Sequence, residues 1–425
     1  MLPIIVASIC AAVSLLLVAG SLCALRRRRL MEDLPTSKTT GVFIGLVELK
    51  GTAETETPFI GFLSDERCVH YSWEIEEHYR CSEDKEEKKT IASGGESAPF
   101  YLRDEKGVVR IDPDRAEIIA ETVLSQTYQT SDPIYYGKGP DTSLEDSMGK
   151  RTFTEKVIKL HQPIYVVGQA RVREDCVAAE IAYDQLAQMF LISTKPEETL
   201  RSEKLWKFWG YGLLAIIAPA ICIALFLLCM EDIEGIYLYP WVEIAVGLGV
   251  AVIPVWFFGW LWTVYNSLIA LRNRLRMAVA NVDVELKRRH DLIPRLVSIV
   301  DGLRKHERDI QETCTLLRSQ MTVQSTSDCQ LSQIQGCARQ VSMLVENYPE
   351  LQANGVFLGL QNNLIETEQR IALARNYYND VIEAYNNRRE RFPESMIAIL
   401  ARLRPVSPFV AENFERCVVK VNLAE

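Results

Sequence analysis

The residue types best suited to metal chemistry gather in one short stretch, where Cys68, His70, His78 and Cys81 lie close together. Thiolates and imidazoles are the usual ligands of zinc in proteins. On an extended strand, however, His70 and His78 would stand roughly 27 Å apart, too far to share one ion unless the strand bends sharply. We therefore interpret this stretch as a polar strand face, with a zinc site as the alternative.

Other groups with chemical potential favour structural roles. The Gly-Lys-Gly-Pro sequence at 137–140 lacks the remainder of a phosphate loop and indicates a turn. His306 falls on the apolar stripe of a predicted helix, which is typical of a buried or seam-edge histidine. Ion pairs along one helix can form among four charged residues of the predicted helix over 360–385: Glu366, Glu368, Arg370 and Arg375. Each such pair contributes roughly 0.2–0.5 kcal/mol. Since no Ser-His-Asp set or Gly-rich phosphate loop accompanies them, we expect no catalytic, cofactor-binding or metal-binding residue.

Length and composition bound the kind of protein. A chain of 425 residues is too long for one core and predicts two or three domains. Its formal net charge of −9 argues against nucleic acid as a partner. The eleven cysteines include no CxxC pair, which favours reduced thiols and cytosol-facing domains. A mean hydropathy of +0.00 is high for a chain with 24% charged residues, because the apolar residues are concentrated in a few runs.

Three of those runs are long enough to span a bilayer: 1–25, 206–230 and 241–264. Four arginines, at 26–29, follow the first run, which is typical of a retained anchor rather than a cleaved signal peptide. The acidic connector 231–240 makes the other two runs a hairpin. Since the Lys/Arg clusters then lie on one side, we expect a multi-pass protein of the cell membrane whose soluble parts both face the cytoplasm.

Between the first two runs, residues 26–205 predict a small β-rich barrel or sandwich. The segments GVFIGLVELKG, CVHYSWEIEEHYR, VVRI, IYVVGQARVR and MFLIST are short, rich in β-branched and aromatic residues and separated by turns. The Asp-Glu-Lys-Gly at 104–107 is a hairpin turn. We interpret the charged run SEDKEEKKT as a surface loop.

After the third run, residues 265–405 predict an antiparallel four-helix bundle. One apolar seam occupies one side of a helix over 360–385, with polar residues elsewhere. We expect a first helix that projects from the bilayer to about Arg289. A second helix should begin with Asp291 as its N-cap and Pro294 in its first turn, and a third should cover 331–345. The fold class is therefore a multidomain α+β membrane protein.

The C-terminal end is more apolar than a solvated tail should be. A short amphipathic helix is predicted, and its residues are candidates for an oligomer or membrane contact: Met396, Ile397, Ile399, Leu400 and Leu403. The remaining tail, 406–425, contains a predicted strand over 418–423.

Several blocks within 36–195 resemble the GIDE domain of mitochondrial E3 ubiquitin ligases and of many bacterial membrane proteins. They are SKTTGVFIGLVELKGTAE, RCVHYSWEIEEH, IASGGESAPFYLRDEKGVVRI, DPIYYGKGP and PIYVVGQARVRED. In those ligases catalysis depends on a RING finger with eight zinc-binding Cys and His positions. This sequence contains no such array, so the residues that would transfer ubiquitin are lacking.

A second resemblance covers 262–405 and is carried by YNSLIALRNRL, VDVELKRRHDLIPRLV, YPELQANGVFLGLQ and IETEQRIALARNYYNDVIEAYNN followed by FPE. These blocks are similar to the LemA family of membrane-anchored helical proteins, a family that implies no enzymatic activity. We therefore expect a non-enzymatic membrane scaffold or docking protein, self-associated in a homo-oligomer, with the bilayer and further proteins as partners. An E3 ubiquitin-ligase-like activity through the GIDE-like part is the alternative.

Overall fold

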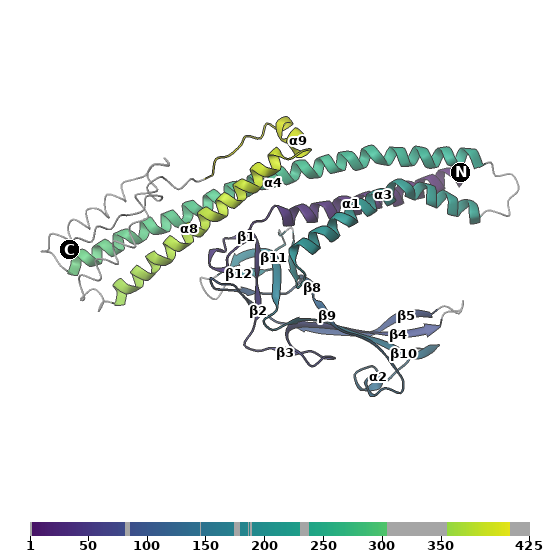
Figure 1. Cartoon of the computed structure of the whole chain (residues 1–425), viewed down its shortest axis with the longest axis horizontal. Helices are drawn as coiled ribbons and strands as arrows, with labels where there is room; N and C mark the ends of the chain where they lie inside the picture. Colours follow the sequence, from purple (N-terminus) through teal and green to yellow (C-terminus); the bar gives the residue numbers. More distant parts are fainter. Residues whose placement is uncertain are drawn as a thin grey trace, which may run out of the picture. The chain divides into compact units, whose positions relative to one another are not determined.

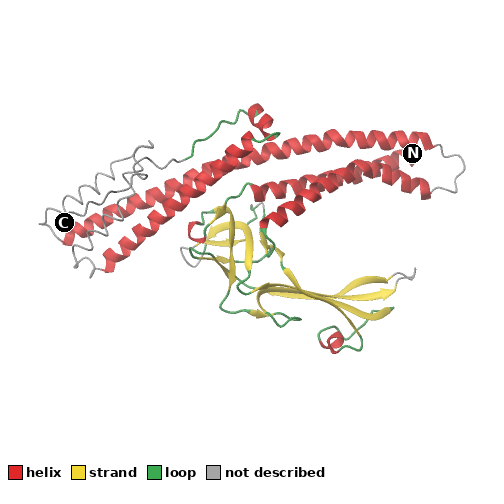
Figure 2. Cartoon of the chain, in the orientation of Figure 1, coloured by secondary structure: helices red, strands yellow, loops and turns green. Residues whose placement is uncertain are grey.

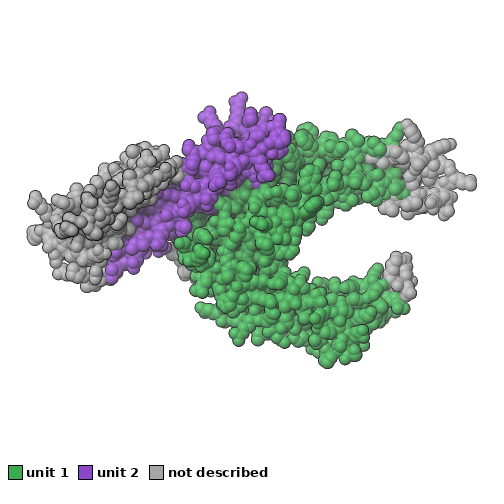
Figure 3. Space-filling view, in the orientation of Figure 1, with its two compact units in different colours: residues 1–267 green, residues 268–425 purple. Residues whose placement is uncertain are grey.

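The described part of the protein is a mixed α+β molecule, in which one long helix precedes the strands of two β-sheets and further long helices follow them (Figures 1 and 2). The computed structural model describes residues 2–80, 86–144, 146–173, 179–185, 187, 189–229, 238–303 and 355–408. The chain divides into two compact units, Met1–Ser267 and Leu268–Glu425 (Figure 3). The first contains both sheets and most of the apolar helical sequence, and the second is helical.

Five strands of unit 1 close into a small barrel. They are β2 (Gly45–Glu54), β6 (Phe100–Arg103), β7 (Val108–Ile111), β11 (Pro163–Val172) and β12 (Ala179–Ala182). Neighbours pair in the order β2-β6-β7-β12-β11, and β11 pairs antiparallel with β2 to complete the ring. Short strands extend it at the rim: β1 (Thr36–Ser37), β8 (Glu117–Ile119) and β13 (Leu191–Ser193). A 3-10 turn, η1 (Thr39–Gly41), follows β1.

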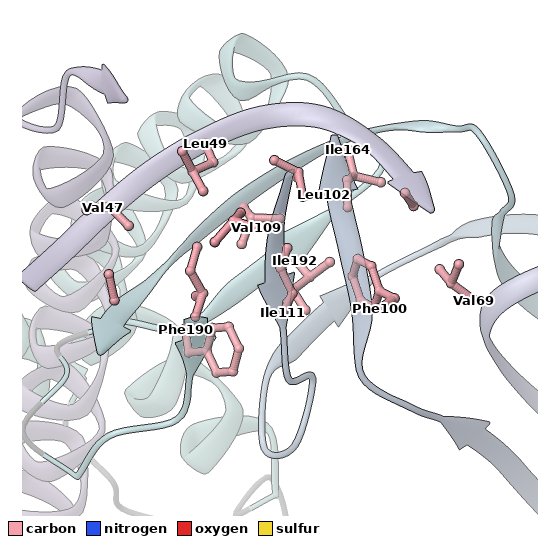
Figure 4. Packing of buried hydrophobic residues seen from close by; sticks show 14 of the residues in the cluster. Val47, Leu49, Val69, Phe100, Leu102, Val109, Ile111, Ile164, Phe190 and Ile192 are labelled. Carbon is pink, nitrogen blue, oxygen red and sulfur yellow. The ribbon is translucent and has the colours of Figure 1, made fainter. Parts of the chain in front are cut away.

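The inside of this barrel is apolar. Alternate positions of its strands point inward, and Figure 4 shows labelled side chains such as Leu102, Val109 and Ile111 grouped between the strands, with Val69 set apart. Leu49, Leu102, Ile111 and Ile192 are fully buried there. Gly51 lies where β2 passes β6, and a Cβ at this position would stand 2.3 Å from the Arg103 carbonyl oxygen. The closed barrel is therefore filled by packed apolar residues, and Gly51 permits the close approach of β2 to β6.

A second, more open sheet forms a half-barrel. Its path is β3 (Phe59–Ile60), β4 (Arg67–Arg80), β10 (Ser147–Lys159) and β9 (Glu121–Gln129), and β5 (Glu86–Ser97) also pairs with β4. The short helix α2 (Pro133–Gly137) lies between β9 and β10 in the chain. The predicted barrel or sandwich is thus a closed barrel continued by a half-barrel, and the predicted hairpin turn at 104–107 joins β6 to β7.

Among the described residues, three helices are long and apolar enough to cross a membrane. They are α1 (Leu2–Glu32), α3 (Glu197–Cys229) and α4 (Leu238–Leu303), with candidate spans over Val6–Glu32, Glu197–Ala224 and Val246–Arg295. Each carries large apolar side chains that the protein itself leaves exposed, among them Leu16, Leu213 and Phe258. The acidic connector predicted at 231–240 lies mostly outside the described residues.

Unit 2 contains the end of α4, the helix α8 (Gly355–Glu390) and the short α9 (Glu394–Leu400). The helix predicted around the 360–385 seam is confirmed. Within the described residues two of the four predicted bundle helices are present, α8 and the continuation of α4. The second predicted helix is described only to residue 303, where it belongs to α4; the third, His306 and the tail from residue 409 lie outside them.

Two expectations are wrong. The predicted break between Arg289 and Asp291 does not occur, because α4 continues through Pro294 to Leu303. Pro294 removes one backbone hydrogen bond, but the apolar side of the helix continues, with Ile293 only 4% exposed. The charged run predicted as a loop contributes residues 86–90 to strand β5, where cross-strand pairing with β4 decides over composition.

Candidate functional site

The residues of the predicted zinc alternative are held apart along β4. Cys68 is buried with its Sγ 3.6 Å from the Phe59 carbonyl oxygen, and burial raises the pKa of its thiol to about 11. His70 is half-buried, and this burial lowers its pKa. His78 contacts Glu86 through Nδ1 (2.5 Å) and Thr152 through Nε2 (2.8 Å). Cys81 lies outside the described residues, and among those described no three His, Cys, Asp or Glu side chains come together as a metal site.

The half-barrel instead buries an ion pair, Glu77 with Arg151, whose side chains are both fully buried and 3.5 Å apart. The Arg151 guanidinium donates hydrogen bonds to the carbonyl oxygens of Tyr135, Pro140 and Thr142 at 2.8–3.0 Å. Its charge also lies 4.1 Å from the centre of the Tyr135 ring. Arg151 therefore fastens the segment between β9 and β10 onto the sheet.

Glu77 completes this cluster from the neighbouring strand. Its carboxylate accepts hydrogen bonds from the hydroxyls of Ser147 (2.5 Å) and Tyr135 (3.0 Å). Burial alone would raise the pKa of Glu77, but these hydrogen bonds and the Arg151 charge together lower it. A carboxylate that stays ionised and fully engaged within the protein has a structural role.

The turn predicted at 137–140 is part of the same cluster. A Cβ on Gly139 would stand 2.3 Å from the Tyr135 carbonyl oxygen and 2.9 Å from Arg151 Nη1. Gly139 is therefore needed for the close approach of the backbone to the guanidinium. This supports the interpretation as a turn and assigns it a partner that the sequence did not reveal.

A second buried polar cluster lies where the barrel meets α3. Glu48 on β2 is 1% exposed and accepts hydrogen bonds from Thr36 Oγ1 (2.6 Å) and Tyr165 Oη (2.9 Å). Lys50 Nζ lies 3.6 Å from the Glu48 carboxylate and 2.7 Å from that of Glu197, in the first turn of α3. Burial raises the pKa of Glu48, only partly opposed by the Thr36 hydrogen bond. We call these five residues the barrel–helix junction.

An apolar cluster reinforces the junction. The cluster contains Met31 near the end of α1, Leu34 just after that helix, Tyr165 on β11 and Leu200 on α3, all buried. Arg27 on α1 also forms an ion pair of 3.0 Å with Glu117 on β8. The barrel is therefore packed directly onto α1 and α3, the two helices that flank it in the sequence.

Farther along, a polar contact joins the three apolar helices of unit 1. Ser21 on α1 is fully buried and donates a hydrogen bond of 2.7 Å to the Phe208 carbonyl oxygen on α3. Trp256 on α4 donates its Nε1–H to Ser21 Oγ at 3.1 Å, and its ring stacks on Phe208 at 5.3 Å. Small residues and paired polar groups are the usual means of packing helices in lipid.

In unit 2, α8 packs along α4 through the predicted seam. Leu364, Thr367, Ile371, Ala374, Tyr378, Val381 and Tyr385 are all less than 9% exposed. Opposite them α4 buries Leu268, Leu271, Leu275, Ala278 and Val282. Arg370 binds the buried Glu285 at 2.9 Å, and Arg289 lies 3.9 Å from Glu368. Two of the charged residues predicted to pair along one helix, Glu368 and Arg370, thus contact charges on α4.

The Tyr-Asn pair at 385–386, near the end of α8, contacts the main chain that follows α9. Tyr385 Oη donates to the Arg404 carbonyl oxygen at 3.0 Å. Asn386 donates to the Val406 carbonyl oxygen (2.8 Å) and accepts from its N–H (3.3 Å). The pair therefore ties the segment that follows α9 back to α8.

The five residues predicted as an oligomer or membrane contact divide into two groups. Ile397 and Leu403 are 7% exposed and belong to the interior of unit 2. Met396, Ile399 and Leu400 lie on the outer face of α9 and are 65%, 77% and 85% exposed. The amphipathic character of this segment was correctly predicted, whereas the partner of its outer face stays a prediction.

Sequence reasoning did not identify Glu48, Tyr165, Glu77 or Arg151. Each lies in a strand whose composition gives no sign that a charged or hydroxylated side chain is buried. Only the pairing of strands distant in the sequence brings these groups together.

These contacts define an α+β protein whose described polar clusters support its architecture and whose described helices include three that are apolar enough to cross a membrane. Comparison with known proteins agrees with the two resemblances. The model of the LemA family matches residues 278–423, and a GIDE model described as E3 ubiquitin ligase matches 72–225. The protein LemA of Metamycoplasma hominis is 24% identical over 155 residues, which are 36% of this chain and 71% of that protein. The chain thus joins a segment that matches the GIDE model to a segment that matches the LemA model.

Proposed function

We propose that this protein is a non-enzymatic, multi-pass membrane scaffold that self-associates and presents its barrel and its helical unit as docking surfaces. The observation that carries the proposal is the barrel–helix junction. A domain attached by a flexible linker would not need buried Glu48 and Tyr165, or the Lys50–Glu197 ion pair, to hold it on α1 and α3. A fixed attachment suits a protein that places surfaces at a defined position relative to the membrane.

The buried clusters support a scaffold over an enzyme. Arg151 donates to main-chain carbonyls, and Glu77 accepts from neighbouring residues, so neither group is presented to a substrate. Active sites more often contain charged groups that lie in a cleft with a perturbed pKa.

We further propose that both soluble parts face the cytoplasm. The four arginines at 26–29 follow the first span directly, and Lys204 and Lys207 lie near the start of the second. Positive residues beside apolar spans favour the cytoplasmic side. Reporter fusions at residues 120 and 425 test this orientation, because translocated behaviour at both positions would contradict it.

Self-association is tested by single-particle imaging of the full chain purified in lipid nanodiscs. We expect a closed assembly of several copies, held together at one recurring interface. A population made only of single protomers, at protein concentrations in the micromolar range, would contradict the scaffold proposal.

The second candidate is an E3 ubiquitin-ligase-like function, favoured by the description of the GIDE model. Because a RING-type site holds stoichiometric zinc, this candidate requires either bound zinc or a recruited partner that brings a RING. Elemental analysis of the purified protein, combined with a ubiquitin-transfer assay with and without a cell extract, separates the two functions. Zinc-free protein that transfers no ubiquitin in either condition excludes the second candidate.

A further inference from the structure

The short helix α9 is held firmly on unit 2 by its inner face. Ile397 and Ala398 are buried, and Glu394 forms an ion pair of 3.4 Å with Arg388 of α8. The segment after it is fastened by the hydrogen bonds of Tyr385 and Asn386 to the main chain at 404–406. Because both ends of α9 are anchored in this way, its orientation on unit 2 is fixed and its outer face stays exposed.

That outer face is apolar. Phe392, Met396, Ile399 and Leu400 are between 65% and 85% exposed, and the last three follow the i, i+3, i+4 spacing of one helix face. Fixing several large apolar side chains in water is unfavourable, at roughly 25 cal/mol for each Å² exposed. An exposed patch of this kind marks a contact surface.

The position of α9 along the chain indicates what it contacts. The pairs Glu285–Arg370 and Arg289–Glu368 show that α8 runs antiparallel to α4. At 1.5 Å per residue in both helices, Asn387 is then level with Leu268, the first residue of unit 2. α9 follows directly after α8. It therefore belongs to the end of unit 2 at which α4 leaves its apolar run.

The charges around α9 favour an anionic surface. Arg391, Arg402 and Arg404 are exposed and flank the apolar face in the sequence, whereas Glu394 is buried in its ion pair. In a twofold contact between two copies, the same patch meets itself, so arginines would approach arginines. Anionic phospholipid headgroups, in contrast, attract the arginines. Each arginine near such a surface strengthens membrane binding by about fivefold.

We propose that α9 is an interfacial membrane anchor: its apolar face lies in the headgroup region of the bilayer that α4 crosses, with the three arginines on anionic lipid headgroups. This would fasten unit 2 to the bilayer at a second point beside α4. The proposal depends on α4 spanning the membrane, but it is independent of self-association.

The test uses the full chain in vesicles of phosphatidylcholine and phosphatidylglycerol, with a fluorescent amino acid in place of Ile399. Lipids brominated in the upper acyl chain quench a fluorophore that lies among them. Two matched positions serve as references: Val250, 59% exposed in the predicted apolar run at 241–264, and Val284, 64% exposed on α4 beyond the end of that run. By the helix rise, position 284 lies about 24 Å beyond the start of unit 2.

We expect quenching at position 399 well above that at 284, and a decrease when phosphatidylglycerol is omitted or when R391Q, R402Q and R404Q are combined. Quenching at 399 equal to that at 284 would overturn the proposal. It would also fall if emission at 399 responded to the protein-to-lipid ratio but not to bromolipids, since a second copy would then cover the face. If position 250 is not quenched either, the membrane assignment of α4 itself fails, which distinguishes the two errors.

Discussion

Replacing Tyr165 by phenylalanine tests whether the barrel–helix junction stabilises the barrel as its contacts imply. The substitution keeps the ring in its apolar surroundings and removes only the hydroxyl that donates to Glu48 at 2.9 Å. Glu48 is 1% exposed, so water cannot replace the lost donor. Thr36 and Lys50 remain as its partners.

The expected magnitude follows from this geometry. A hydrogen bond to a charged group contributes about 1.5–3 kcal/mol, and Glu48 keeps one hydroxyl donor and one cation. We therefore expect Y165F to lower the free energy of opening the barrel by about 2 kcal/mol. The matched control is Y101F on β6, where the side chain is 38% exposed and water solvates the hydroxyl. There the change should stay below about 0.5 kcal/mol.

The double variant E48L/Y165F separates the hydrogen bond from other effects. E48L alone leaves the buried Tyr165 hydroxyl without its acceptor, whereas the double variant removes both partners. Replacing both partners of a buried hydrogen bond is far less costly than removing one. The stability loss in the double variant should therefore be smaller than the sum of the two single losses by about 1–2 kcal/mol.

The measurement is amide hydrogen exchange of β2 and β11 in the full chain in nanodiscs, because local opening energies do not require two-state unfolding. A Y165F effect no larger than that of Y101F, or additive effects in the double variant, would refute the assigned role of the junction.

The pH dependence gives an independent check. Burial raises the pKa of Glu48 in the folded state, so the folded protein favours the protonated carboxyl. Its contribution is therefore most favourable below the ordinary carboxyl pKa and is lost as pH rises through the raised folded pKa. The opening energy of β2 should decrease across that window in the parent protein, and this part of the decrease should be absent in E48L.

Two further predictions concern the other clusters. G139A should destabilise the 133–147 segment by about 2 kcal/mol, because its Cβ would meet the Arg151 guanidinium. G137A is the matched control and should have little effect, because the space around its Cβ is open. Limited proteolysis of that segment measures both. R370A should weaken the packing of α8 on α4 by about 2 kcal/mol by leaving Glu285 buried without its partner. The double variant E285A/R370A should recover part of that loss, as measured by hydrogen exchange in α8.

The helical part could be predicted well because its information is local. A seam of period 3.6 identifies the buried face of α8 whatever it packs against, and seven of its residues are buried as expected. The same logic failed at Pro294, since a proline and a capping residue predict where a helix can begin, not where it must. The buried side of α4 continues past that point at Ile293 and keeps the helix continuous.

The β part could be predicted only as strands. Barrel closure depends on β2 pairing with β11, more than a hundred residues away in the chain, and nothing local encodes that register. The same pairing brings Tyr165 to Glu48, so the junction was invisible for the same reason. The edge strand β5 was mistaken for a loop because charged side chains are what protect an exposed edge.

The contrast between the buried clusters and α9 bears on how this protein acts. Glu77, Arg151 and Glu48 are directed inward and engaged by neighbouring residues, at distances that leave no room for a substrate. The outer face of α9 is the reverse, because unit 2 provides an ion pair and several hydrogen bonds to hold apolar side chains in the open. Chemistry at a site requires reactive groups to be accessible, whereas docking requires a rigid, exposed surface. In its described part the chain has the second arrangement at α9, which is the arrangement that the proposed scaffold function requires.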